Sequence, residues 1–130
     1  MALSYSTTLR NAMLDAISSA AGTSATLKFY DGTRPATGGT ATNLLATLTC
    51  GAGAFAAAAS GGALTANAIT SANASATGTA TWARLASSGG TFVADMNVGT
   101  SGSDINMTSV SFVSGQPVAV SSFVITEGNA

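Results

Sequence analysis

The chain has 130 residues, a length typical of one domain, and its charged side chains are only four cations and five carboxylates, with a formal net charge of -1. Charged residues make up 7% of the chain, against roughly 25% in an average globular domain. Four scattered cations cannot line up against a run of phosphates. We therefore expect no nucleic-acid partner and no attraction to an anionic membrane surface.

The hydrophobic fraction is 46%, but much of it is alanine. Leu, Ile, Val and Phe together amount to about a fifth of the chain, a level that predicts a small core. Disorder would require a high net charge as well, which this sequence lacks. Self-association or docking is expected to supply part of the stability. We expect neither a secretory signal nor a membrane span, because no continuous apolar segment approaches the required length.

The first predicted element is an amphipathic helix over Ser6–Ser19. A cap from Ser6, Thr7 or Thr8 would begin it, and Gly22 would end it. Such helices usually pack on their own domain, so a cover for one face or end of a sheet is favoured over an arm that docks on a neighbour. Four large apolar residues form its stripe: Leu9, Met13, Leu14 and Ile17.

Beyond Gly22 the apolar residues alternate with polar ones, which indicates β-strands. The clearest pair flanks the turn Ser87–Gly90, where a hairpin would place Trp82 and Phe92 in or beside the core. With about seven to nine short strands and no long helix between them, the sequence predicts an all-β fold. We expect an antiparallel β-sandwich or jelly-roll-like domain over 25–130, preceded by an arm and a short helix over 1–24. The predicted strands are Ala25–Tyr30, Asn43–Thr49, Ala54–Ala58, Ala63–Ile69, Thr79–Leu85, Thr91–Val98, Val110–Val113 and Val118–Thr126.

Groups able to carry out catalysis are scarce. The chain has no histidine, which removes the usual general base and the usual zinc ligand. Cys50 is predicted to be a buried filler, and Lys28 a surface charge that discourages pairing at a sheet edge. Hydrolysis by two of the scattered carboxylates remains the least favoured alternative. We therefore expect no enzyme, no catalytic residue, no metal and no cofactor.

Six segments carry a pattern that is seen elsewhere: Leu9–Ala12, Leu27–Gly32, Thr79–Leu85, Thr91–Asp95, Val98–Asn106 and Val118–Asn129. Together they resemble small proteins encoded in the structural modules of tailed bacteriophages. The resemblance covers most of the chain, and its motifs are structural. It implies a virion component, made in the bacterial cytoplasm and most similar to the capsid decoration (cement) proteins, several of which are small β-sandwiches present as trimers.

The resemblance implies two partners. One is other copies of the chain, in a homo-oligomer that would be a trimer, and the other is the major capsid protein on the capsid surface. A tail, head-tail junction or fibre component, acting in assembly or in binding a receptor or glycan, is the alternative. With so few charges, contacts should rest on small apolar residues, backbone hydrogen bonds and β-edge pairing. The expected docking elements are the N-terminal residues and the loops Thr33–Ala41 and Gly99–Asp104. Their candidate interface residues are Met1, Leu3, Tyr5, Arg34, Pro35 and Asp104.

Overall fold

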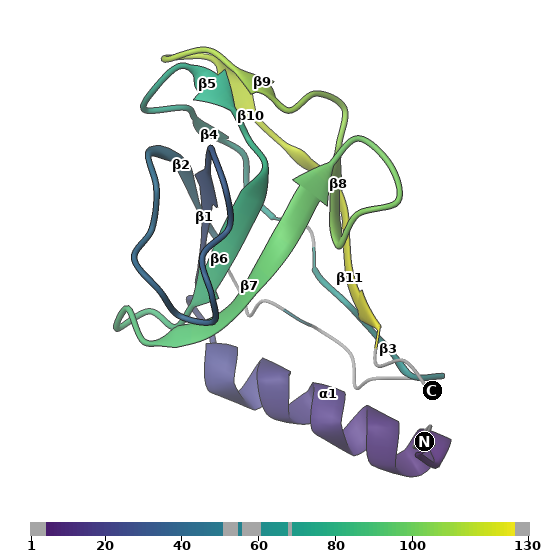
Figure 1. The fold of residues 1–130 in the computed structure, drawn as a ribbon. Coiled ribbons are helices and arrows are strands. Elements are labelled where there is room, and N and C mark those ends of the chain that lie inside the picture. Colours follow the sequence, from purple (N-terminus) through teal and green to yellow (C-terminus); the bar gives the residue numbers. More distant parts are fainter. Residues whose placement is uncertain (1–4, 51–54, 56–60, 68, 127–130) are drawn as a thin grey trace.

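The computed structural model describes residues 5–50, 55, 61–67 and 69–126 (Figure 1). This part of the chain is mostly β-structure with one helix, so the predicted all-β class with a short N-terminal helix is confirmed. The elements are α1 (Thr7–Ala21), β1 (Thr26–Tyr30), β2 (Leu44–Thr49), β3 (Ala63–Thr65), β4 (Ala72–Asn73), β5 (Gly78–Thr79), β6 (Trp82–Ala86), β7 (Phe92–Gly99), β8 (Ile105–Met107), β9 (Ser111–Phe112), β10 (Pro117–Val118) and β11 (Val120–Thr126).

Seven strands form one sheet in the order β2-β1-β6-β7-β8-β11-β3. Two small sheets, β4 with β10 and β5 with β9, complete the described β-structure. The neighbours are antiparallel, as predicted for most of the sheet, except β7 and β8, which run parallel and make the sheet mixed. In Figure 1, β1, β6 and β7 lie on one side, β8 and β11 on the other, and α1 crosses below them.

The helix begins and ends as predicted. The Ser6 hydroxyl accepts a hydrogen bond from the Leu9 amide at 3.2 Å, and Gly22 closes the helix with a positive φ of 73° and a bond to Ser18. The buried face lies differently from the predicted stripe. Leu14 is fully buried, whereas Leu9 is 45% exposed. The contact face therefore passes through Leu14 and Ala21, and Leu9 lies outside it.

The predicted hairpin is present as β6 and β7, but its side-chain pattern differs. Ala94, Met96 and Val98 alternate along β7 and share the inner face of the sheet. An irregularity between Leu85 and Ala86 shifts the register, so that Ala86 pairs with Phe92. Phe92 is thereby turned to the opposite face of the sheet, because one extra residue reverses the side-chain direction.

The main core lies between the inner face of the sheet, the helix and the small sheets. Phe29 of β1 packs edge-on against Phe112 of β9, with ring centroids 5.7 Å apart. The ring of Phe55 contacts that of Phe123 in β11, with centroids 5.6 Å apart. Leu14 brings the helix into the same apolar cluster. The large side chains thus bind the elements together in spite of the alanine-rich composition.

Short strands account for the remaining differences. β3 ends at Thr65, earlier than the predicted strand over 63–69, and β4, β5 and β8 were not predicted. The predicted strand over 54–58 falls outside the described residues, apart from Phe55, which is buried. The helix α1 is too short to cross a membrane, and no other helix occurs among the residues that the structure describes.

Candidate functional site

The outer face of the sheet, opposite the main core, holds the most organised group of polar and aromatic side chains. Neighbouring strands place these residues in two rows. In one row Lys28 of β1 pairs with Arg84 of β6, and Arg84 pairs with Asp95 of β7. In the other row Tyr30 pairs with Trp82. The cross-strand register alone therefore gathers groups from three strands at one place.

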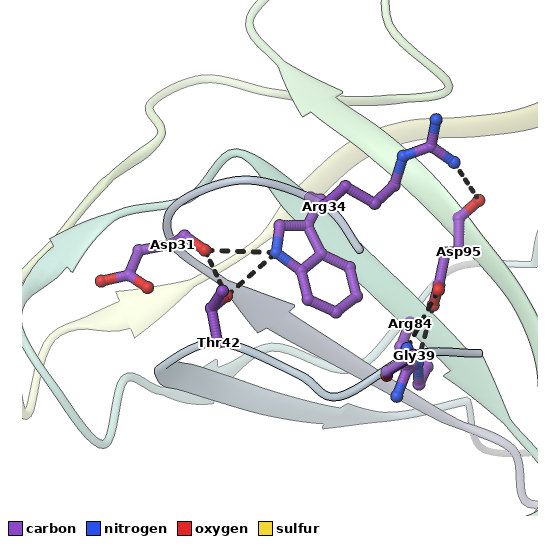
Figure 2. A network of polar contacts seen from close by, with 7 residues as sticks. Asp31, Arg34, Gly39, Thr42, Arg84 and Asp95 are labelled. Atoms are coloured by element: carbon purple, nitrogen blue, oxygen red, sulfur yellow. Dashed lines mark hydrogen bonds and ion pairs between the residues drawn. The ribbon is translucent and has the colours of Figure 1, made fainter. Parts of the chain in front are cut away.

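Trp82 is fully buried on this face, although it lies away from the main core. Its ring stacks on Tyr30, with centroids 4.5 Å apart and an interplanar angle of 17°. Its indole Nε1 donates to the backbone oxygen of Asp31 and to the hydroxyl of Thr42, both at 3.1 Å (Figure 2). The Thr42 hydroxyl itself donates to the same Asp31 oxygen. The indole is thus buried with its polar atom satisfied, as a stable site requires.

Arg84 forms the second anchor of the outer face. Its Nε and Nη2 donate to the two carboxylate oxygens of Asp95 at 2.7 and 3.0 Å, and Nη2 also donates to the Gly39 oxygen at 2.8 Å (Figure 2). The guanidinium lies 5.3 Å from the centre of the Trp82 ring and 5.2 Å from that of Phe92. The hydrogen bond with Asp95 raises the pKa of Arg84 further above its ordinary value. Arg84 therefore joins two strands and a loop through one planar group.

The loop that covers this face comprises residues 31–43, and we call it the strap. The Asp31 carboxylate accepts from the amide and the side chain of Asn43 at 3.1 and 3.2 Å, which ties the two ends of the strap together. The Thr81 hydroxyl donates to the Gly32 oxygen at 2.6 Å. Arg34 reaches the backbone oxygen of Asp95 at 3.4 Å. The strap is consequently fastened to β6 and β7 along its length.

The candidate interface residues lie at different places. Met1 and Leu3 are outside the described residues, and Tyr5 is half-buried just before the helix. Arg34 and Pro35 belong to the strap, where Arg34 is exposed and Pro35 half-buried. The Asp104 carboxylate accepts from the Asn97 amide at 3.1 Å, so it caps the loop after β7. The structure thus gathers two of the candidates in the strap and leaves Asp104 in a separate loop.

The polar partners of Trp82 and Arg84 were not predicted from the sequence. Asp31 and Thr42 look like ordinary turn and loop residues, because nothing in their spacing indicates an indole between them. The pairing of Arg84 with Asp95, in contrast, could have been predicted from the sequence. Both residues lie on the polar side of a predicted hairpin, and its turn places them opposite each other.

Cys50 and Lys28 have simpler surroundings. Cys50 is buried, as predicted, and burial raises the pKa of its thiol, which keeps it in the weakly nucleophilic protonated form. Lys28 was predicted to protect a sheet edge, but β1 lies between β2 and β6. The edge strand beside β1 is β2, which has no charged residue. The predicted protective role of Lys28 is therefore wrong.

Two hollows lie near the strands at the C-terminal side of the described chain. One, of about 230 Å³, lies between the segment after β3 and strand β11; the other, of about 200 Å³, lies around β9 and β10. Both are lined by uncharged residues. Among the residues that the structure describes, no three His, Cys, Asp or Glu side chains come together as a possible metal site.

Comparison of the chain with protein-family models, with curated proteins and with solved structures gave no match. Its function therefore has to be inferred from its own surfaces. Two surfaces stand out: the strap over the outer face, and the uncharged edge at β2.

Proposed function

We propose that the chain is a structural protein of a tailed-bacteriophage particle, a capsid decoration (cement) protein that stabilises the head by binding major capsid subunits. In this proposal its β-structure forms a jelly-roll-like sandwich, and copies assemble as a homo-oligomer, with a trimer as the form that the family resemblance implies. The strap is the docking surface. The resemblance supplies the virion assignment, and the properties of the strap support a role in binding.

The observation that carries the proposal is a loop held in one shape that presents an almost uncharged surface. The strap is fixed by the bonds of Trp82, Thr81 and Arg84 to its backbone. A loop ordered before binding loses little further entropy when a partner docks, so recognition can rest on shape. Apart from Arg34, the exposed residues with side chains in the strap are neutral: Thr33, Ala36, Thr37, Thr40, Thr42 and Asn43.

A neutral docking surface has a measurable consequence. Attraction between charges is screened by salt, whereas packing and backbone hydrogen bonds are screened little. Binding of the purified protein to capsids that lack it should therefore change less than about twofold between low and physiological salt. Release from the shell as salt rises would contradict docking through neutral groups.

Two exposed alanines offer a matched test of the docking surface. Ala36 lies in the strap and Ala12 on the outward side of α1. We expect Ala36→Glu to weaken capsid binding at least about tenfold, because it buries a carboxylate without a partner at the contact. Ala12→Glu should bind like the parent chain. The opposite pattern would make the helix the docking arm and the strap a purely internal fastening.

The second candidate is a tail, head-tail junction or fibre module that binds a receptor or glycan. One observation favours it: the hollow beside β11 is lined by Thr65, Asn67, Ser121 and Ser122, whose hydroxyl and amide groups suit a sugar. Copy number separates the candidates. Quantitative mass spectrometry of purified particles should give hundreds of copies for a head decoration protein and tens for a fibre module. A protein absent from purified particles would refute both.

A further inference from the structure

The two edges of the seven-stranded sheet differ in their protection. One edge is β3, which has only three residues. The other is β2, which has six residues, Leu44–Thr49, without a charge or a proline. Short edge strands and charged or proline-bearing edges resist pairing with other chains, whereas a longer neutral edge is a template for it. By these criteria β3 is protected and β2 is open.

Hydrogen bonding shows which groups of β2 face outward. The Cys50 amide donates to the Ala25 oxygen at 2.8 Å, so Cys50 and alternate residues before it bond with β1. The residues between them turn their backbone groups to the edge. The Leu45 oxygen is already used by the amides of Ser75 and Ala76, at 2.8 and 3.3 Å.

After Leu45, the next two residues that turn their backbone groups to this edge are Thr47 and Thr49. Both are exposed, and no described residue bonds with their outward amides and carbonyls. Two donors and two acceptors therefore point away from the sheet at strand spacing. An added strand would satisfy all four at once.

We propose that this edge binds the same edge of a second copy of the chain, with the two β2 strands antiparallel about a two-fold axis at Leu48. This deepens the proposed function, on which it rests, by naming the contact between copies. Such an isologous contact closes as a two-fold dimer, so it replaces the trimer that the resemblance implies. In this register Thr47 of one copy lies opposite Thr49 of the other, and each such pair exchanges two backbone hydrogen bonds. Pairing is confined to this stretch, because Ser75 and Ala76 occupy the position beside Leu45.

The chemistry of the edge suits a second copy. An isologous contact places the same residues on both sides, so it tolerates no charge at its centre, and β2 has none. Facing threonines on the outer face form favourable cross-strand pairs. Lys28, one strand inward, would lie about three strand spacings, or ~14 Å, from its counterpart, beyond the screening length at physiological salt. The join therefore extends the sheet without bringing like charges together.

The contact is small, three residues from each copy, so we expect weak association that grows with concentration, as on a crowded particle surface. Sedimentation velocity over a concentration series of the purified full chain is the first measurement. The second is hydrogen exchange in the unmodified chain. The amides of Thr47 and Thr49 should exchange at least about fivefold more slowly at high concentration than at low, while the Thr65 amide on the opposite edge should not change.

Proline substitutions supply the matched variants. Thr47→Pro removes one outward donor, and prolines are tolerated at the outward positions of edge strands. Thr65→Pro is the control, because the bond from the Ala66 amide to the Phe123 oxygen leaves Thr65 facing outward in the same way on β3. We expect Thr47→Pro to weaken association at least about tenfold and Thr65→Pro to leave it unchanged.

Each outcome decides the question. A chain that stays monomeric at all concentrations, or one that associates without slower exchange at Thr47 and Thr49, overturns the proposal. An equal loss of association in Thr47→Pro and Thr65→Pro also overturns the proposal. If Thr47→Pro fails to fold, the exchange measurement on the unmodified chain still decides. Presence in purified particles together with a monomer in solution would refute the pairing of copies and leave the proposed role on the capsid standing.

Discussion

Removal of the Trp82 side chain should destabilise the chain and loosen the contact between the strap and the outer face of the sheet. The ring is fully buried between Tyr30 and the strap, so Trp82→Ala loses the transfer free energy of a large side chain and leaves a cavity. Such substitutions cost about 3–5 kcal/mol. For a domain of this size, at about 4 °C per kcal/mol, the melting temperature should fall by roughly 12–20 °C.

Trp82→Phe separates packing from hydrogen bonding. It keeps most of the apolar surface but removes the donor to Asp31 and Thr42. Because Thr42 and Asp31 remain bonded to each other, the loss should be only about 1 kcal/mol beyond the reduced packing. Thermal unfolding followed by circular dichroism gives the two losses, and hydrogen exchange over residues 31–43 reports on the strap. An unchanged melting temperature in Trp82→Ala, or a strap that stays equally protected, would refute the anchoring role of Trp82.

Three further predictions concern the same face and the buried thiol. Arg84→Lys should destabilise the chain by about 1–2 kcal/mol in denaturant titrations, because an ammonium cannot hold both Asp95 oxygens and Gly39 at once; a stability equal to that of the parent would contradict this. Gly38→Ala should cost about 1–2 kcal/mol by the same assay, since Gly38 has a φ of 68°, and a neutral result would mean that the strap can rearrange there. Stability should be flat between about pH 6 and 8, as the chain has no histidine, and should decline above about pH 9. Burial raises the pKa of both Cys50 and Tyr30, so the unfolded chain loses these protons first and unfolding is favoured as the pH rises. Cys50→Ala should make the alkaline decline shallower, and an unchanged slope would exclude the thiol as a source.

The sequence could predict the elements that contain large apolar residues. The helix, its Ser6 cap, strands β1 and β2 and the hairpin of β6 and β7 follow from periodicity, because their buried side chains are much larger than their exposed ones. The strands β4 and β5 have only two residues each and lie in a segment of Ala, Gly, Ser, Thr and Asn, where no periodicity can show. Their position depends on distant partners, β10 and β9.

The candidate site was less predictable than the fold. The predicted hairpin placed Phe92 in or beside the core, and a single register shift placed it on the outer face beside Arg84. The strap is a loop of small residues, and its order comes from Trp82, whose sequence position is far away. Side-chain period can locate a strand, but it cannot show that a loop folds back over the polar face of a sheet.

The strand order determines when each strand can find its partner during synthesis on the ribosome. Within the described strands, β3 pairs only with β11, which also pairs with β8. On a ribosome β3 emerges long before β11, so it has no sheet partner while the hairpin of β6 and β7 can already form. Contacts between distant segments close late and slowly. A nascent chain paused before β11 should therefore hold the part of the sheet from β2 to β8, with β3 unpaired, and β11 is the strand that completes the sheet.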